Sequence, residues 1–381
     1  MIDISAHRLG EAEQQLRTEV REFLAKERAT EAFEPRCDAW MSSPDPAFSR
    51  RLGDRGWLGM TLPRRYGGHD RSPLERFVVV EELLAAGAPV AAHWIADRQM
   101  APSILRHGTE EQRLRYLPGI ARGECFFAIG MSEPDAGSDL AAVRTRAREV
   151  ADGWELTGTK LWTTGAHFAH AMVVLARTDG TPEDRHTGLS QFVVDLPHPG
   201  IQVRPIVTID GEHHFNEVVF DRAVIPGGAL LGERGAGWSQ VMAELADERS
   251  GPERFLSTAP LLAAWVAETR DAGADPVTTR EIGRLTAQAW ALRQLSLAVA
   301  AELARGRSPD VPAALVKDLG SSFEGEVVET VRRLAQVEPR RGAGGLAGLL
   351  AEGVLHSPAF TLRGGASEVL RSVVARGLGV R

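Results

Sequence analysis

A compact polar loop, Ser132–Asp139 with the sequence SEPDAGSD, carries residue types that bind an acceptor-rich ring. Ser132 and Ser138 supply hydroxyls, while Pro134 and Gly137 turn the chain and leave backbone N–H groups available as donors. An isolated loop of this composition is more often an ordinary surface turn. Its chemical interpretation therefore depends on a second segment.

That second segment, residues 158–165, reads GTKLWTTG and places a large aromatic side chain beside two hydroxyls. Trp162 could stack against a planar cofactor, and Thr164 could hydrogen-bond the edge of its ring. A lone strand tryptophan more often belongs to a core. A loop and a strand in this order and spacing are together much more specific, and they predict a site for a flat cofactor.

Helical patterns flank the β-rich segment that must position these residues. Leu16, Val20 and Phe23 recur on one face of a predicted N-terminal helix, and Thr109 precedes a first turn rich in Glu and Gln. Short runs of Val, Thr, Phe and Trp then predict a meander of strands, before long Ala/Leu-rich helices return. The order predicts an α+β fold and excludes a repeating βαβ fold. The predicted parts are an N-terminal helical domain (1–125), a middle β-barrel or sandwich domain (126–235) and a C-terminal four-helix-bundle domain (236–381).

Composition narrows the class of protein. The chain has 381 residues, 43% of them hydrophobic, which is ample for more than one domain, and its net charge of -7 argues against nucleic-acid binding. Two cysteines, Cys37 and Cys125, form no disulfide framework, so a reducing, cytoplasmic location is expected. No apolar run reaches membrane-spanning length, and the N-terminus lacks a secretory pattern. His213 and His214 would point to opposite faces of a strand, so no metal is expected.

Almost the whole chain resembles the acyl-CoA dehydrogenase family, including actinobacterial-type members. The resemblance rests on RYGGHDRSPLERFVVVEEL, GTEEQRLRYLPGIARGE, SEPDAGSDL, GTKLWTTGA and FTLRGGASEVLRSVVARGLGVR. It implies an FAD cofactor and an acyl-CoA substrate, with Ser138 on the acyl-CoA side. The flavin contacts that it implies are Ile129, Met131, Ser132, Trp162, Thr163, Thr164, Gly365, Ala366, Ser367 and Glu368.

The resemblance also implies a reaction. A carboxylate removes the pro-R α-proton of the thioester, hydride leaves Cβ for the flavin, and the product is a 2,3-enoyl-CoA. Many members carry the base where this chain has Gly364, which cannot abstract a proton. Other members use a Glu-Arg pair, so Glu248 is the expected base and Arg249 its anchor, with Glu253 as a rival that Gly251-Pro252 could re-aim.

Two family signatures are missing, and the losses leave several functions open. ETRDAGADPVTTR lacks the Arg-x-x-Phe-Gly segment that crosses the dimer interface, and RRGAGGL lacks the spacing of the Gln-x-x-Gly-Gly-x-Gly loop. The chain is therefore expected to form a homo-oligomer or a heteromer with a related chain, and to pass electrons to an electron-transfer flavoprotein-type acceptor. The alternatives are a catalytically incomplete or structural subunit, or a relative that oxidises a carrier-bound acyl group or another substrate.

Overall fold

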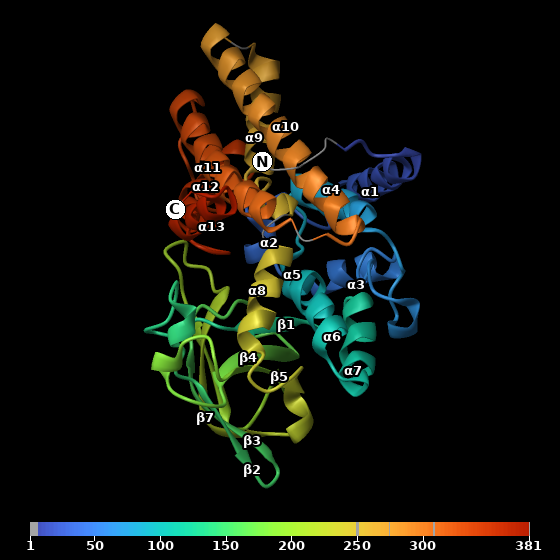
Figure 1. The fold of residues 1–381 in the computed structure, drawn as a ribbon. Coiled ribbons are helices and arrows are strands. Elements are labelled where there is room, and N and C mark those ends of the chain that lie inside the picture. Colours follow the sequence, from blue (N-terminus) through green and yellow to red (C-terminus); the bar gives the residue numbers. More distant parts are fainter. Residues whose placement is uncertain (1–6, 249–250, 274, 308, 381) are drawn as a thin grey trace. The chain divides into compact units, whose positions relative to one another are not determined.

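The computed structural model describes residues 7–248, 251–273, 275–307 and 309–380, while the side chains of residues 245–248 lie outside this description (Figure 1). The chain divides into two compact units. Unit 1 comprises residues 1–44, 71–90 and 248–381, and unit 2 comprises residues 45–70 and 91–247.

The named elements in the described residues of unit 1 are all helices or helical turns. Its helices are α1 (Glu11–Ala29), α2 (Ala39–Ser42), α4 (Pro73–Ala85), the 3-10 turn η6 (Pro252–Arg254), α9 (Ala259–Ala272), α10 (Pro276–Ala304), α11 (Asp310–Leu334), α12 (Gly345–Phe360) and α13 (Ser367–Gly377). The predicted face of α1 is confirmed, because Leu16, Val20 and Phe23 are buried. Helix α11 contacts α10, α12 and α13, and its Val327 and Val331 lie in an apolar core with residues of α9, α10 and α12.

Local chemistry explains where α4 begins and ends. Ser72 Oγ accepts from Glu75 N (3.1 Å), and the Glu75 carboxylate accepts from Ser72 N (2.8 Å). Pro73 then occupies the first turn, where its missing N–H costs no helical bond. Gly87 follows the helix with a φ of 64°, a conformation that glycine adopts without strain.

Unit 2 combines short helices with a sheet. Its helices are α3 (Pro46–Asp54), η1 (Arg64–Tyr66), α5 (Ala91–Ile95), the π-helical turn η2 (Ala96–Met100), α6 (Ala101–His107), α7 (Glu110–Ala121), η3 (Leu140–Ala142), η4 (Pro182–Asp184), η5 (Gly227–Ala229) and α8 (Gly237–Glu248), which ends at the unit boundary. The predicted start of α7 is confirmed: Thr109 Oγ1 accepts from Gln112 N (3.2 Å) in a reciprocal capping box.

One eight-stranded mixed sheet forms the rest of unit 2. Its strands are β1 (Phe127–Gly130), β2 (Arg146–Val150), β3 (Gly153–Lys160), β4 (Ala171–Arg177), β5 (Leu189–Asp195), β6 (Ile201–Ile206), β7 (Phe215–Ile225) and β8 (Leu230–Leu231). The order is β6-β7-β3-β2-β4-β5-β8, and β1 pairs with β4 in parallel. The strands thus depart from the simple meander expected from the sequence, because β3 pairs with β7 across the unit.

Strand β4 is buried on both faces, and its alternating side chains serve two cores. Ala171 and Val173 join the apolar residues of α6 and α7, whereas Met172 and Val174 join a core supplied by β1 to β7. The sheet therefore surrounds a core of its own while helices cover its other face. The α+β fold class is confirmed, whereas the three domain boundaries remain a prediction. Among the described helices, none combines the length and apolar character needed to cross a membrane.

Candidate functional site

The polar loop and the tryptophan segment meet in unit 2. Leu161 N donates to Ser132 O (2.9 Å), and Lys160 Nζ donates to Met131 O (2.9 Å). Lys160 ends β3, while Met131 and Ser132 follow β1. Two predicted flavin contacts, Met131 and Ser132, therefore lie beside the segment that carries Trp162.

A buried ion pair holds this loop, and sequence reasoning did not identify it. Glu133 accepts from Lys160 Nζ (2.7 Å), Arg144 N (2.7 Å) and Thr145 N (2.9 Å). Burial alone would raise the pKa of Glu133, but Lys160 and the N–H donors outweigh it, and the pKa lies below its usual range. Burial lowers the pKa of Lys160 to about 8 against the attraction of Glu133. The signal was an acid within the loop and a lysine at an inward position of β3.

Trp162 is presented outward by a strained backbone. Its φ is 57° and its side chain is 55% exposed, with its ring edge-on to Phe215 at 5.7 Å between centroids. Because β3 ends at Lys160, Trp162 follows the strand and does not belong to it. A non-glycine residue held at positive φ with an exposed aromatic ring is typical of a binding position.

Thr163 lies behind Trp162 and is fully buried. Its backbone exchanges hydrogen bonds with Asn216 (3.0 and 3.1 Å), and Asn216 Nδ2 also donates to Thr163 O (2.9 Å). Within the described residues, Thr163 Oγ1 has no hydrogen-bond partner. Thr164 is half-buried. Asn216, which sequence reasoning missed, thus fixes a segment that carries an unused hydroxyl.

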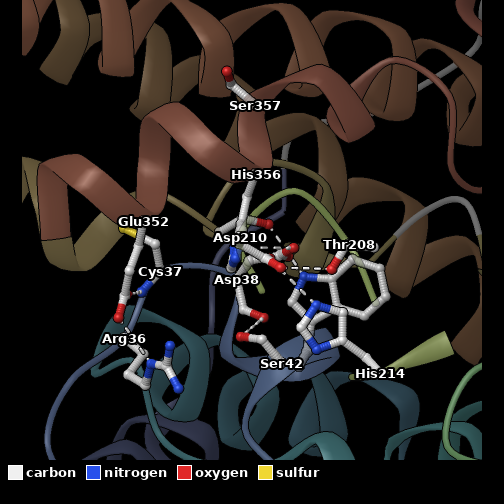
Figure 2. Close-up of polar contacts among 12 residues, drawn as sticks. Arg36, Cys37, Asp38, Ser42, Thr208, Asp210, His214, Glu352, His356 and Ser357 are labelled. Carbon is white, nitrogen blue, oxygen red and sulfur yellow. Dashed lines mark hydrogen bonds and ion pairs between the residues drawn. The ribbon is translucent and has the colours of Figure 1, made fainter. Parts of the chain in front are cut away.

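Two histidines set aside in the sequence have defined roles in unit 2. His213 Nε2 lies 2.8 Å from Asn216 Oδ1, so it supports the same segment. His214 Nε2 lies 3.5 Å from Asp210, which accepts from Thr208 Oγ1 (2.5 Å) (Figure 2). These contacts explain both side chains as supports of the β6–β7 connection.

Two other predicted contacts of unit 2 lie on the same loop or its strand. Ile129 is half-buried on β1 and pairs with Val173 of β4. Ser138 is exposed at the loop tip, next to Asp139, whose carboxylate pairs with Arg185 at 2.6 Å. Ser138 is thus accessible for the substrate contact predicted from the family resemblance.

The remaining predicted flavin contacts belong to unit 1. Gly365 and Ala366 lie in the turn between α12 and α13, and Ser367 and Glu368 begin α13. Gly365 has a φ of 100°, and Ser367 is buried with an Oγ that has no partner among the described residues. The Glu368 side chain is exposed.

The candidate bases differ in how far the structure describes them. Glu248 is the last residue of α8 and its side chain lies outside the described residues, as does the whole of Arg249. Glu253 and Arg254 form η6 and are 1% and 2% exposed, with Arg254 Nε 3.9 Å from Glu253 Oε1. A Cβ added to Gly364 would lie 2.8 Å from Arg254 Nη1. The buried pair therefore adjoins the position where many relatives carry their base.

Comparison with family models covers nearly the whole chain. The acyl-CoA dehydrogenase N-terminal domain matches residues 10–124, the middle domain matches 128–223 and the C-terminal domain matches 235–379. The three matches follow the order of helices, strands and helices in the fold.

Several curated relatives are mycobacterial acyl-CoA dehydrogenases. Acyl-CoA dehydrogenase IpdE1 of Mycolicibacterium smegmatis is 30% identical, over 95% of this chain and 96% of its own. Acyl-CoA dehydrogenases FadE34 and FadE29 of Mycobacterium tuberculosis are 33% and 34% identical over 88% and 66% of this chain. The chain spans only 46% of FadE34 and 65% of FadE29.

Solved structures show the same fold. The Tcur3481-Tcur3483 steroid ACAD superposes with a TM-score of 0.87 at 30% identity, covering 98% of this chain and 99% of its own. The ChsE4-ChsE5 complex of Mycobacterium tuberculosis gives a TM-score of 0.82 at 26% identity, covering 99% and 100%.

Acyl-CoA dehydrogenases are flavin oxidoreductases that act on CH–CH bonds of acyl-CoA, with FAD as the cofactor. The described residues fit such a group. Trp162 offers an exposed aromatic face, and Thr163 Oγ1 and Ser367 Oγ are hydroxyls without partners among the described residues. With three domain matches and a relative aligned over nearly its full length, the chain belongs to the acyl-CoA dehydrogenase family, with FAD as its cofactor.

Proposed function

We propose that this chain catalyses the α,β-dehydrogenation of an acyl-CoA thioester to a 2,3-enoyl-CoA. The single observation that carries the proposal beyond the family is the buried Glu253–Arg254 pair beside Gly364. Removal of an α-proton requires a carboxylate shielded from water, because hydration lowers its basicity. Glu253 satisfies this requirement within unit 1.

The chain's own groups divide the work. Glu253 or Glu248 takes the α-proton. The positive charge of Arg254 offsets the negative charge of the neighbouring Glu253 carboxylate. Trp162 and the Thr163–Thr164 hydroxyls orient the cofactor. FAD, when bound, supplies an acceptor for the hydride that leaves Cβ. Glu248 remains the base predicted from the sequence, but two observations favour Glu253: it is buried, and its neighbour Arg254 lies where a side chain at position 364 would extend.

Substitution of each glutamate decides between them. E253Q is expected to lower turnover with an acyl-CoA and an artificial electron acceptor by ~10²–10⁴-fold, the usual contribution of a general base. E248Q is expected to retain most of the turnover. Glu268, exposed on α9, provides the matched control as E268Q. FAD absorbance of each purified variant must equal that of the wild type for the comparison to hold.

The outcomes separate the hypotheses. A large loss in E248Q with normal turnover in E253Q would return the base to Glu248. Normal turnover in both variants would contradict a glutamate base in this segment. A wild-type chain that binds FAD but dehydrogenates no acyl-CoA would contradict the proposed reaction itself.

A bulky acyl group is the proposed substrate class. The support is the Tcur3481-Tcur3483 steroid ACAD, which is 30% identical over almost the whole of both chains. We expect a CoA thioester with a steroid side chain to give a higher kcat/KM than butyryl-CoA or octanoyl-CoA. Equal or better use of the short straight chains would contradict this assignment.

A second candidate function is that of one subunit in a heteromeric acyl-CoA dehydrogenase. Two solved neighbours, Tcur3481-Tcur3483 and ChsE4-ChsE5, are pairs of different chains, and this chain lacks two flavin signatures of the family. Size-exclusion chromatography and flavin absorbance of the chain expressed alone test the idea. A yellow, active homo-oligomer would exclude an obligate partner.

An electron-transfer flavoprotein is the proposed electron acceptor. One solved structure that resembles the chain, at a TM-score of 0.85 and 25% identity, is titled for the electron transferring flavoprotein of Acidaminococcus fermentans. Substrate-dependent bleaching of such an acceptor by the purified enzyme would support the assignment. Turnover with molecular oxygen as efficient as with the flavoprotein would argue against it.

A further inference from the structure

Arg363 occupies a buried socket in unit 1, immediately before Gly364. Its guanidinium pairs with Asp38, donates to Ser257 Oγ (3.0 Å) and lies 3.8 Å from the Glu324 carboxylate. Only 13% of the side chain is exposed. Its polar partners come from three segments far apart in the sequence: Asp38 pairs with Nη1, while Ser257 and Glu324 both lie beside Nη2.

Two aromatic rings complete the socket. The guanidinium carbon lies 4.5 Å from the centroid of the Trp40 ring and 4.9 Å from that of Phe360. Arg254 approaches the same Trp40 ring at 5.3 Å. The indole therefore lies against both arginines, and cation–π contacts of this kind are strengthened by burial.

Ser257 fixes the geometry of the socket. Its Oγ accepts from Trp40 Nε1 (3.1 Å) and from Arg363, and donates to Glu253 O (3.3 Å). A serine hydroxyl has one donor and two acceptor sites, so all three are used. Its backbone N–H also donates to Glu324 (2.7 Å).

The Asp38 side of the socket is anchored to α12. Glu352 accepts from Arg36 Nε (2.8 Å) and from Cys37 N (2.9 Å), and Ser42 Oγ donates to Asp38 O (3.1 Å) (Figure 2). Asp38 is itself buried. The backbone on both sides of Asp38 is therefore fixed by hydrogen bonds, which positions the carboxylate that pairs with Arg363.

The turn that follows Arg363 has little stiffness of its own. Gly364 and Gly365 have φ values of 67° and 100°, and glycines pay a large entropy cost when ordered. Ser367 N donates to Thr361 O (3.1 Å) across the turn. An anchor beside the glycines can supply the order that their backbone lacks.

We propose that Arg363 is a positioning residue whose socket of Asp38, Trp40, Ser257 and Glu324 holds the turn 364–367 in place. Its consequence for FAD rests on the proposed function, since this turn is a flavin contact only by family resemblance. An arginine is needed because its planar guanidinium donates to a carboxylate and a hydroxyl through separate nitrogens while its flat face stacks on the rings, and a compact lysine ammonium has no such face.

Hydrogen exchange of the full chain tests the positioning role without any cofactor. In R363M, the amides of residues 364–368 are expected to exchange at least about tenfold faster than in the wild type, as in a locally opened segment. R363K is expected to restore only part of the protection. R371M is the matched control, because Arg371 pairs with Asp318 (3.1 Å) from the exposed face of α13.

A double variant keeps the test decisive if R363M folds poorly. D38N/R363M removes the buried charge that R363M leaves behind, so its thermal stability is expected to exceed that of R363M. The amides of residues 364–368 are expected to exchange as fast in D38N/R363M as in R363M. Wild-type protection of the turn in folded R363M, or in D38N/R363M, would overturn the inference.

FAD titration tests whether the position of the turn affects cofactor binding. The Kd of R363M or D38N/R363M for FAD is expected to rise at least about tenfold, whereas R371M keeps the wild-type Kd. A loosened turn with a wild-type Kd would overturn the link to the cofactor. A wild-type chain that binds no FAD would contradict the proposed function, while the exchange measurement would still decide whether Arg363 holds the turn.

Discussion

The Glu133 carboxylate shows how one buried side chain can hold the polar loop Ser132–Asp139. It satisfies two backbone N–H groups and the Lys160 ammonium, which in turn reaches the carbonyl of Met131. The loop that carries Ser132 is thus tied to the end of β3 by charge-assisted bonds, which are stronger than neutral ones.

Removal of one partner of this pair should be costly. K160M is expected to lower the free energy of unfolding by ~3–5 kcal/mol, because it strands a buried charge. E133Q/K160M should lose less than the sum of the two single variants. R148M, which breaks the exposed Arg148–Glu155 pair (2.9 Å), is the control and should cost less than about 1 kcal/mol in the same denaturant titration. Equal costs for K160M and R148M would contradict the role assigned to the pair.

Glu324 predicts a pH dependence of stability. Burial raises the pKa of Glu324 to about 7, although Arg363 and Ser257 act in the opposite direction. Since the folded pKa exceeds the unfolded value of 4.5, the contribution is fully present below about pH 4.5 and is lost as pH rises through about 7. E324Q should remove a decline on the order of 3 kcal/mol between pH 4.5 and 8.

Urea unfolding at a series of pH values measures this change. E329Q, on the exposed side of the same helix α11, is the control and should keep the wild-type slope. A slope in E324Q as steep as in the wild type would show that other groups cause it.

At the scale of elements, the close approach of α11 to η6 fixes the neighbourhood of Glu253 and Arg254. A Cβ added to Gly320 would lie 2.1 Å from Arg254 O, whereas one added to Gly325 would meet nothing within 4 Å. Both glycines are on α11, so they form a matched pair. Because Gly320 has no side chain, α11 can approach the backbone of Arg254, the residue next to the candidate base Glu253.

Alanine at these two positions should have opposite effects. G320A is expected to destabilise the protein by ~1–3 kcal/mol, because backbone must move to make room. G325A should stabilise it by ~0.5–1 kcal/mol through helix propensity. Thermal unfolding with turnover assays would measure both, and G320A should also lower kcat by displacing Arg254. Stabilisation by G320A would contradict the contact.

At the scale of the whole molecule, cofactor binding should couple to stability. A ligand that binds only the native state stabilises it by ~2.7 kcal/mol at a concentration of 100 Kd. FAD is therefore expected to raise the Tm of the apoprotein, and W162A should reduce the shift by weakening binding. NAD is the control that should leave the Tm unchanged. An unchanged Tm at saturating FAD would favour the hypothesis that this chain is a subunit that binds FAD only with a partner chain.

Part of this architecture was accessible from the sequence because it depends on short segments. The periodicity of α1 and the capping residues of α7 act within a few residues, so they predicted these helices correctly. Residue types and order also indicated the α+β class, and the family resemblance predicted which segments contact the flavin. The strand order was not accessible in this way, because the pairing of β3 with β7 joins segments more than 50 residues apart.

The sequence by itself determined the family, the order of helices and strands, and the segment that presents Trp162. Only the tertiary structure decided which charges are buried together. Asp38 and Arg363 are 325 positions apart, and the local sequence around them resembles that of solvated residues. Burial and partner choice depend on long-range packing, so the arginine socket, the Glu133–Lys160 pair and the closeness of Gly364 to Arg254 emerged from the fold.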